Sequence, residues 1–266
     1  MPGSSRGVAA RISRAAISVG IAALAVATPY APASVVMTGT RVIYDADAPS
    51  RSVQLTNEDD KPNVIQAWVD SGDPDSTPQT ADAPFIVTPP LFRMEPRTGQ
   101  EVRVVYTGPR PAQDREAVFY LNTVQIPPMD AAYAGQNQVL VLVRNRVKLF
   151  YRPSTIPGRP ERAHEQLRFR ATRQQGDLLV TASNGSGYHI SMIDAHLSAD
   201  GENFAFLPDM VAPYADRSWR VAGAGRLAGR LMRVRYRFLN DSGGVVQAEA
   251  PLDASVDASA GSSIKP

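Results

Sequence analysis

Few side chains in this sequence have the types and spacings that catalysis requires. The three histidines, His164, His189 and His196, are scattered and have no second ligand at the spacing of a metal site. The chain contains no cysteine, so disulfides, thiolate nucleophiles and cysteine-based metal centres are excluded. No Gly-x-Ser-x-Gly motif occurs, and the glycines at 223, 225 and 229 miss the spacing of a dinucleotide-binding loop, so we expect a plain loop there. We therefore expect no catalytic residue, no metal ion and no cofactor.

The most informative segment is residues 137–152, which contains five consecutive apolar residues at 139–143, then alternates basic or polar residues with apolar ones, and stops at Pro153. The segment is rich in β-branched residues and lacks Gly and Pro, which predicts one unusually long β-strand. The pattern leaves two interpretations open. The strand is either buried on both faces of a sandwich, or it outruns its sheet and offers unpaired N–H and C=O groups to a strand from another chain.

Length and composition describe an exported, ordinary globular protein. The 266 residues suffice for two domains, and 43% hydrophobic with 20% charged residues argues against disorder. A net charge of +2 with no basic blocks excludes a dedicated nucleic-acid binder. Residues 1–33 combine three arginines, an apolar run at 15–27 and Ala31-Pro32-Ala33, the pattern of a cleavable signal peptide.

The remainder of the chain reads as strands and turns with no amphipathic helix. Candidate strands in the first half are 35–44, 51–56, 64–69, 85–88, 102–106, 118–124 and 137–152; those in the second half are 167–171, 178–182, 190–197, 204–207, 218–221, 231–239 and 245–250. This rhythm is typical of immunoglobulin-like sandwiches. We predict one domain at 34–152, a proline-rich linker at 153–160, a second domain at 161–254 and a flexible tail at 255–266.

A series of short motifs carries a family resemblance. In chain order they are Gly-Thr-Arg-Val-Ile-Tyr at 39–44, Gln-Ala-Trp-Val at 66–69, Thr-Pro-Pro at 88–90 with Arg93 and Glu95-Pro96, Asp-Arg-Glu at 114–116, Phe-Tyr at 119–120, Ile-Pro-Pro at 126–128, Lys-Leu-Phe-Tyr-Arg-Pro at 148–153 and, more faintly, Asn-Asp-Ser-Gly-Gly at 240–244. The chain resembles the periplasmic pilus-assembly chaperones of the PapD-like chaperone–usher family.

This resemblance implies an all-β fold of two immunoglobulin-like β-sandwich domains in a boomerang arrangement. It also implies an ATP-independent, non-enzymatic chaperone in the periplasm that binds pilus or fimbrial subunits and delivers them to an outer-membrane usher. By donor-strand complementation, the long strand would fill a gap in the subunit with Val139, Val141 and Val143.

The resemblance also implies two groups of charged site residues. Arg41 and Lys148 match the pair that anchors the subunit's C-terminal carboxylate, and Glu116, Arg152 and Asp241 match a charge network between the domains. The family counterpart of Pro90 follows a cis bond, which makes Pro90 the candidate here.

The three valines and Lys148 are expected on opposite faces of the predicted strand. Strict alternation places Lys148 on the face opposite the three valines, so we expect a bulge, a bend or a strong twist between Arg144 and Val147.

The sequence also allows two other classes of function. A structural pilus or adhesion protein with tandem immunoglobulin-like domains is the main alternative, but a pilin should carry an N-terminal donor extension and usually a cysteine pair. A secreted hydrolase lacks a nucleophile–base pair. The short loop at 129–136 and the absence of cysteine resemble chaperones that serve thick, rod-like pili. The long apolar edge also makes self-association of the free protein a candidate.

Overall fold

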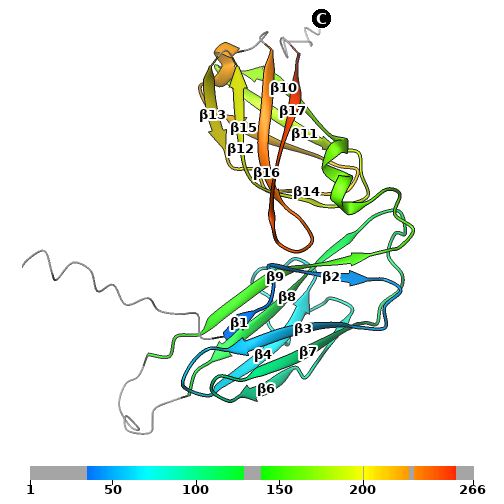
Figure 1. Ribbon diagram of the computed structural model, residues 1–266, viewed down its shortest axis with the longest axis vertical. Helices are drawn as coiled ribbons and strands as arrows, with labels where there is room; N and C mark the ends of the chain where they lie inside the picture. The colour runs from blue at the N-terminus through cyan, green and yellow to red at the C-terminus, as the bar shows by residue number, and fades with distance from the viewer. Residues whose placement is uncertain (1–34, 129–138, 200, 228–230, 256–266) are drawn as a thin grey trace, which may run out of the picture. The chain divides into compact units, whose positions relative to one another are not determined.

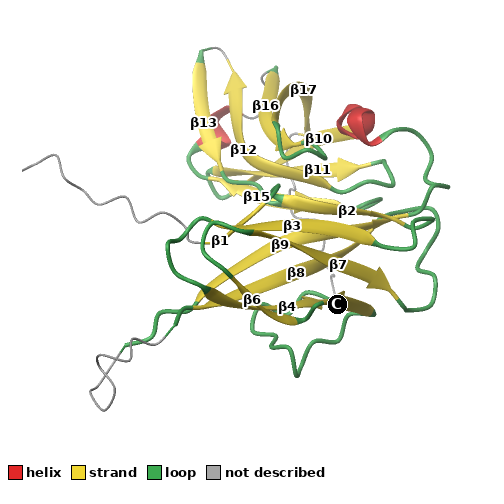
Figure 2. Ribbon diagram, turned by 60° about the horizontal axis from the view of Figure 1, so that its bottom comes forward, coloured by secondary structure: helices red, strands yellow, loops and turns green. Residues whose placement is uncertain are grey.

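A computed structural model describes residues 35–128, 139–199, 201–227 and 231–255. The predicted signal peptide, the predicted short loop at 129–136 and most of the predicted tail lie outside these ranges. Within them the regular structure is almost entirely β-strand (Figures 1 and 2), and no helix has the length and hydrophobicity needed to cross a membrane.

The first half of the chain forms a two-sheet sandwich. Its strands are β1 (Val35–Met37), β2 (Arg41–Asp45), β3 (Arg51–Asn57), β4 (Asn63–Asp70), β5 (Phe85–Thr88), β6 (Leu91–Met94), β7 (Gly99–Tyr106), β8 (Ala117–Ile126) and β9 (Val143–Arg152). One sheet has the order β1-β3-β7-β5 and the other the order β2-β9-β8-β4-β6. Alternate side chains from both sheets, among them Leu55, Val104, Leu121 and Leu149, form one buried core. This arrangement confirms an immunoglobulin-like sandwich.

The predicted strand at 35–44 is divided between the two sheets. β1 pairs with β3, whereas β2 pairs in parallel with β9. The chain turns at Gly39, whose φ of 92° lies in the left-handed region that glycine adopts without steric cost. As a result β2 begins part-way along β9, where Arg41 lies opposite Lys148.

The long strand is shorter than its pattern predicts. Its ladder with β8 begins at the pair Val143–Gln125, and residues 139–142 have no strand pairing. The physical reason lies across the ladder, because β8 ends at Ile126 and the next two residues, Pro127 and Pro128, have no N–H to donate. Residues 137 and 138 lie outside the described ranges. The interpretation of 139–143 as a strand buried on both faces is wrong, since all five side chains are exposed.

The register of the β8–β9 ladder shows which side chains of β9 share a face. Its register is continuous from Val143–Gln125 to Tyr151–Ala117, so no bulge is present. Val147, Leu149 and Tyr151 face the core of the sandwich, and Val139, Val141 and Val143 continue the same odd-numbered series. Lys148 belongs to the even-numbered series, together with Phe150 and Arg152, so the valines and the lysine need not share a face.

The second half of the chain forms a second sandwich. Its strands are β10 (Leu167–Gln174), β11 (Asp177–Asn184), β12 (Ile190–Ala199), β13 (Glu202–Phe206), β14 (Met210–Val211), β15 (Asp216–Val221), β16 (Met232–Leu239) and β17 (Val245–Ser255). They follow the order β13-β12-β16-β17-β10-β11-β15, with β14 on β12. The sheet folds over its own core, because Phe206 of β13 and Trp219 of β15, at opposite ends of the order, have ring centroids 6.1 Å apart.

Two local expectations are corrected by the backbone. The cis peptide bond joins Thr88 to Pro89, so the assignment to Pro90 is wrong by one residue. The chain also contains short 3-10 helices, η2 (Pro160–Gln166) and η3 (Ala224–Leu227), the latter within the glycine-containing segment that we expected to be a loop.

Shortening a side chain to alanine should affect stability differently at the two ends of the β9 region. Leu149 is fully buried, so Leu149→Ala should lower the free energy of unfolding by about 2–5 kcal/mol through lost burial and a residual cavity. Val141 is 68% exposed, and Val141→Ala should leave stability within about 0.5 kcal/mol of wild type. Urea denaturation of both variants measures this difference. Equal losses would mean that residue 141 is packed in the free protein.

Candidate functional site

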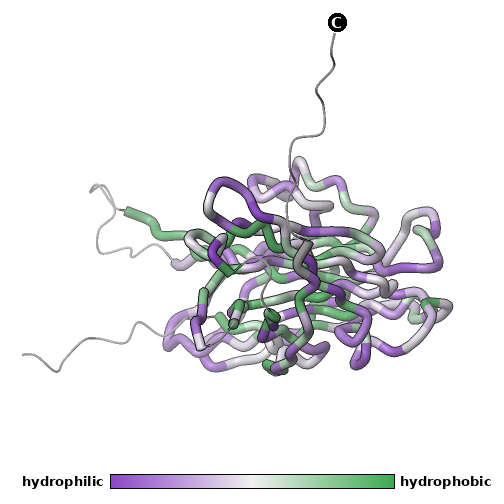
Figure 3. The backbone as a smooth tube through the Cα atoms, turned by 90° about the horizontal axis from the view of Figure 1, so that it is seen from above, coloured by the Kyte–Doolittle hydropathy of each residue, from purple (hydrophilic) through white to green (hydrophobic). Residues whose placement is uncertain are grey.

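An exposed apolar segment precedes β9. Val139 is 92% exposed and Val141 68%, and Leu140, Leu142 and Val143 are exposed as well. Figure 3 shows a hydrophobic segment, coloured green, that extends away from the sandwich at this end of β9. A run of exposed aliphatic side chains is unusual on a soluble monomer and is typical of a surface that another protein covers.

The same segment leads into an open strand edge. On the side of β9 away from β8, β2 pairs only with Lys148 to Arg152, and the part of the chain that the structure describes gives Val143 to Val147 no ladder partner on that side. A strand added there lies in line with β2. Figure 1 shows β2 beside β9. If the added strand runs parallel to β9, its C-terminus arrives beside Arg41 and Lys148, which are paired at the start of β2.

Arg41 is half-buried at this junction. One of its guanidinium nitrogens, Nη1, donates a 3.1 Å hydrogen bond to the Leu239 carbonyl oxygen, while its Nε is buried without a hydrogen-bond partner. The guanidinium carbon lies 5.8 Å from the centre of the Phe150 ring. Burial lowers the pKa of Arg41, and the charges of Asp241 and Glu116, which act in the opposite direction, do not offset it.

Lys148 is the second cation at the junction. Among the described residues its ammonium group has no ion-pair partner. Burial, and then the like charge of Arg41, lower its pKa. Two adjacent, poorly compensated cations at the end of an open edge can both donate hydrogen bonds to one carboxylate.

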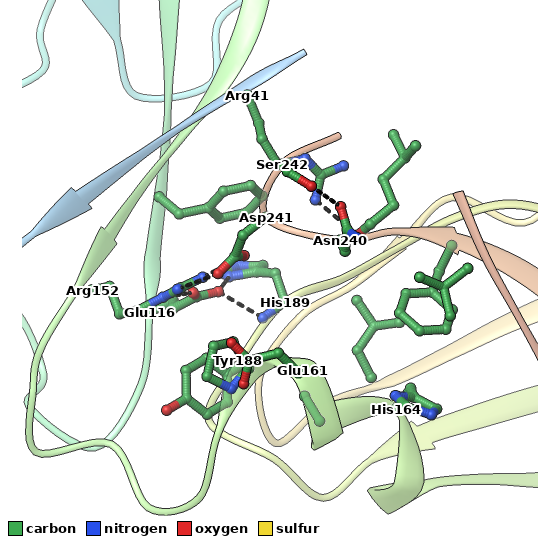
Figure 4. A pocket seen from close by; sticks show the side chains of 17 residues that line it. Arg41, Glu116, Arg152, Glu161, His164, Tyr188, His189, Asn240, Asp241 and Ser242 are labelled. Atoms are coloured by element: carbon green, nitrogen blue, oxygen red, sulfur yellow. Dashed lines mark hydrogen bonds and ion pairs between the residues drawn. The ribbon is translucent and has the colours of Figure 1, made fainter. Parts of the chain in front are cut away.

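The predicted charge network is assembled around Arg152, the last residue of β9. Arg152 Nε donates to Glu116 Oε1 at 2.7 Å, and Nη1 and Nη2 donate to the two Asp241 oxygens at 2.6 and 2.8 Å. Figure 4 shows the three side chains converging. Burial by itself would lower the pKa of Arg152, but hydrogen bonds to Asp241 and the charge of Glu116 outweigh it and raise the pKa.

Sequence reasoning missed one member of this network, His189. Its backbone N–H donates to Glu116 Oε2 at 2.8 Å, and its Nδ1 lies 3.1 Å from the same oxygen. A single histidine between strands carries no spacing signal that could have identified it. Its contacts show a structural partner of a buried carboxylate.

A cavity of about 300 Å³ lies beside these groups (Figure 4). Arg41, Arg152, His189 and Asp241 line its polar part, and Phe150 and Phe238 line its apolar part. Among the residues that the structure describes, no group of three or more His, Cys, Asp or Glu side chains is placed to hold a metal ion. Two cations, Arg41 and Arg152, and aromatic side chains lie together at this cavity, an arrangement that can bind an anion next to an apolar surface.

The buried pair of Arg152 and Glu116 should be coupled in stability. The side chain of Glu116 is 2% exposed and that of Arg152 15%, so Arg152→Met leaves a buried carboxylate short of its cation. We expect a loss of about 3–5 kcal/mol in the free energy of unfolding. The double variant with Glu116→Gln should lose less than the sum of the single losses by at least about 1 kcal/mol, as measured by urea denaturation. Strictly additive losses would contradict a coupled network.

Two family models match the chain. The model described as "Pili and flagellar-assembly chaperone, PapD N-terminal domain" matches residues 34–157, and "Pili assembly chaperone PapD, C-terminal domain" matches residues 162–250. The chain belongs to the PapD family of pilus-assembly chaperones. Both matches include the residues gathered at this site, Arg41 and Lys148 in the first and Asp241 in the second.

Individual members of the PapD family resemble the chain over most of its length. The chaperone protein FimB/FhaD of Bordetella pertussis is 34% identical over 239 residues, covering 88% of this chain and 95% of that protein. The probable fimbrial chaperone YadV of Escherichia coli is 34% identical over 223 residues, covering 83% and 90%. A crystal structure of the YadV chaperone matches with a TM-score of 0.70 and covers 82% of this chain and 100% of that one. The SafB chaperone, solved in complex with the SafA pilin of Salmonella enterica, matches with a TM-score of 0.66 at 25% identity over 82% of this chain and 96% of that one.

Proposed function

We propose that this protein is a periplasmic chaperone that binds pilus subunits by donating the segment 139–147 as a strand. The observation that carries the proposal is an exposed apolar segment continuous with an open strand edge that ends at two poorly compensated cations. Relatives named as fimbrial chaperones, and the SafB chaperone solved with a pilin, support the class of partner.

The mechanism divides into main-chain, side-chain and terminal contacts. The open edge of β9 supplies N–H and C=O groups for a ladder, which gives affinity without reading sequence. Val139, Val141 and Val143 enter an apolar groove of the subunit, each contributing on the order of 1.5–3 kcal/mol of burial before association costs. Arg41 and Lys148 bind the C-terminal carboxylate and set the register, because a slip of one residue would turn every valine away from its pocket.

The remaining roles follow from this mechanism. Glu116, Arg152 and Asp241 hold the domain at 161–254 against the domain at 34–152, across the linker at 153–160, and bind no subunit. The protein acts without catalysis or a cofactor, and it delivers its subunit to an outer-membrane usher. In the free protein the apolar segment promotes self-association.

The proposal is tested by recovery of partners from the periplasm. The mature protein, tagged after residue 266, is purified from its native cells, and co-purifying proteins are identified by mass spectrometry. A pilin-like subunit in a soluble one-to-one complex is expected with wild type and not with the Arg41→Ala, Lys148→Ala double variant. Polymerisation of the protein itself, or identical partners for both versions, would instead favour a structural pilus protein.

A further inference from the structure

Three cations lie at alternate positions of β9, namely Arg144, Arg146 and Lys148, on one face of the strand. This spacing creates a register problem for an added strand. A slip of one residue is excluded by the apolar pattern, but a slip of two residues keeps every side chain on its correct face. The carboxylate of a subunit bound two residues out of register would meet Arg146 instead of Lys148.

The structure holds Arg146 away from such a carboxylate. Its Nη2 donates to Asp70 Oδ1 at 2.7 Å and its Nε to Asp70 Oδ2 at 3.3 Å. Its guanidinium carbon lies 3.6 Å from the centre of the Tyr120 ring. Both contacts fix the guanidinium on the sheet formed by β8 and β4, and a carboxylate already balances its charge.

The surroundings of Asp70 favour its ionised form. It is the last residue of β4 and is fully buried, and its oxygens also accept from Asn122 Nδ2 at 2.7 Å, from the Gly72 N–H at 2.8 Å and from Ser76 Oγ at 3.1 Å. Burial alone would raise the pKa of Asp70, but the hydrogen bonds, with that from Arg146 foremost, outweigh it and lower the pKa. Asp70 therefore stays ionised at neutral pH.

Arg144 is occupied in a different way. Its Nη2 and Nε donate to Asn122 Oδ1 at 2.7 and 3.1 Å, and its Nη1 donates to the Pro74 carbonyl oxygen at 2.8 Å. Its guanidinium carbon lies 5.0 Å from the centre of a Trp68 ring. Of Arg144, Arg146 and Lys148, Lys148 is the one with no hydrogen bond or ion pair to another described residue, although the charge of Asp209 acts on it from a greater distance.

We propose that Asp70 is a register-determining residue: by pairing with Arg146 it leaves Lys148, with Arg41, as the anion site at which the C-terminus of an added strand stops. The inference rests on the proposed function. Asp70 acts through Arg146 and does not touch the subunit, so its role is positioning. A variant at residue 70 that keeps the shape of the side chain but not its charge should allow a second register, two residues away, beside the original one.

The natural absence of cysteine allows register to be read by disulfide trapping. Leu142→Cys places a thiol on an exposed residue that is not one of the donor valines. The probe is a set of synthetic peptides of alternating valine and threonine with a free C-terminus, each carrying one cysteine at a different position. In this background we expect one peptide position to be trapped at least about tenfold more than its neighbours of the same face.

Asp70→Asn should add a second trapped position, two residues nearer the peptide's C-terminus, with a yield comparable to the first. The double variant Asp70→Asn, Arg146→Gln should return to the single original position, because the competing cation is gone. An unshifted single position in Asp70→Asn, with its fold verified by circular dichroism, would overturn the inference.

A second variant tests the same idea without touching the buried network. In Lys148→Gln, with Asp70 intact, we expect trapping to be lost at all positions by at least about tenfold. A two-residue shift in that variant would show that Arg146 is available despite Asp70, and would overturn the inference. Failure of the proposed function looks different: peptides with an amidated C-terminus would then be trapped by the Leu142→Cys protein as well as free acids are.

Discussion

Lys148→Ala is expected to weaken binding of a subunit's C-terminal strand by on the order of 100-fold. Lys148 has no hydrogen bond or ion pair to another described residue. Burial and the charge of Arg41 lower its pKa despite the opposing charge of Asp209, so a carboxylate that arrives between the two cations gains from both. Without the lysine, Arg41 alone must compensate a partly desolvated carboxylate, while its Nη1 is already committed to the Leu239 carbonyl. The loss should therefore exceed that of a surface charge.

The measurement is a titration of a labelled C-terminal subunit peptide, followed by fluorescence anisotropy. Lys61→Ala is the matched control, because Lys61 is exposed in the turn between β3 and β4 and should leave affinity unchanged. Amidation of the peptide should weaken its binding to wild type about as much as the Lys148→Ala mutation does. It should weaken binding to the Lys148→Ala variant only slightly further. If amidation weakens both proteins equally, Lys148 does not contact the carboxylate.

The fold is accessible from sequence because its determinants are local. Alternating apolar residues define most strands, turn residues separate them, and the pattern leads to the sandwich class without long-range information. The ends of elements are less accessible. Nothing in residues 139–142 shows that their ladder with β8 is missing, because that ladder fails at Pro127 and Pro128 on the other strand.

The site shows the same division between local and long-range information. Arg41 and Lys148 are 107 positions apart, and only the β2–β9 register makes them neighbours. Asp70 stands at the start of a polar loop, where a solvated turn residue is the ordinary expectation, yet it is fully buried against Arg146. His189 likewise acquires its role only from Glu116, a residue of the other sandwich. The motif resemblance identified Arg41 and Lys148. The roles of Asp70 and His189 follow only from packing in the folded chain.

Val141→Asp should prevent recovery of subunit complexes while leaving the free protein folded. Its side chain is 68% exposed in the free protein, so a carboxylate there remains hydrated and stability should stay within about 0.5 kcal/mol of wild type. In the complex the same carboxylate would enter an apolar groove with no partner, which costs at least several kcal/mol. Binding should therefore fall by about a thousandfold or more.

Leu142→Asp provides the matched control for this substitution. Leu142 is the next residue, is also exposed and lies in the opposite alternation series, so it faces away from the groove if the segment binds as a strand. We expect Leu142→Asp to weaken recovery much less than Val141→Asp, and Val141→Thr to fall between wild type and Val141→Asp. Equal effects at 141 and 142 would show that the segment binds as a hydrophobic patch without strand alternation, and normal complexes with Val141→Asp would show that it does not enter the subunit.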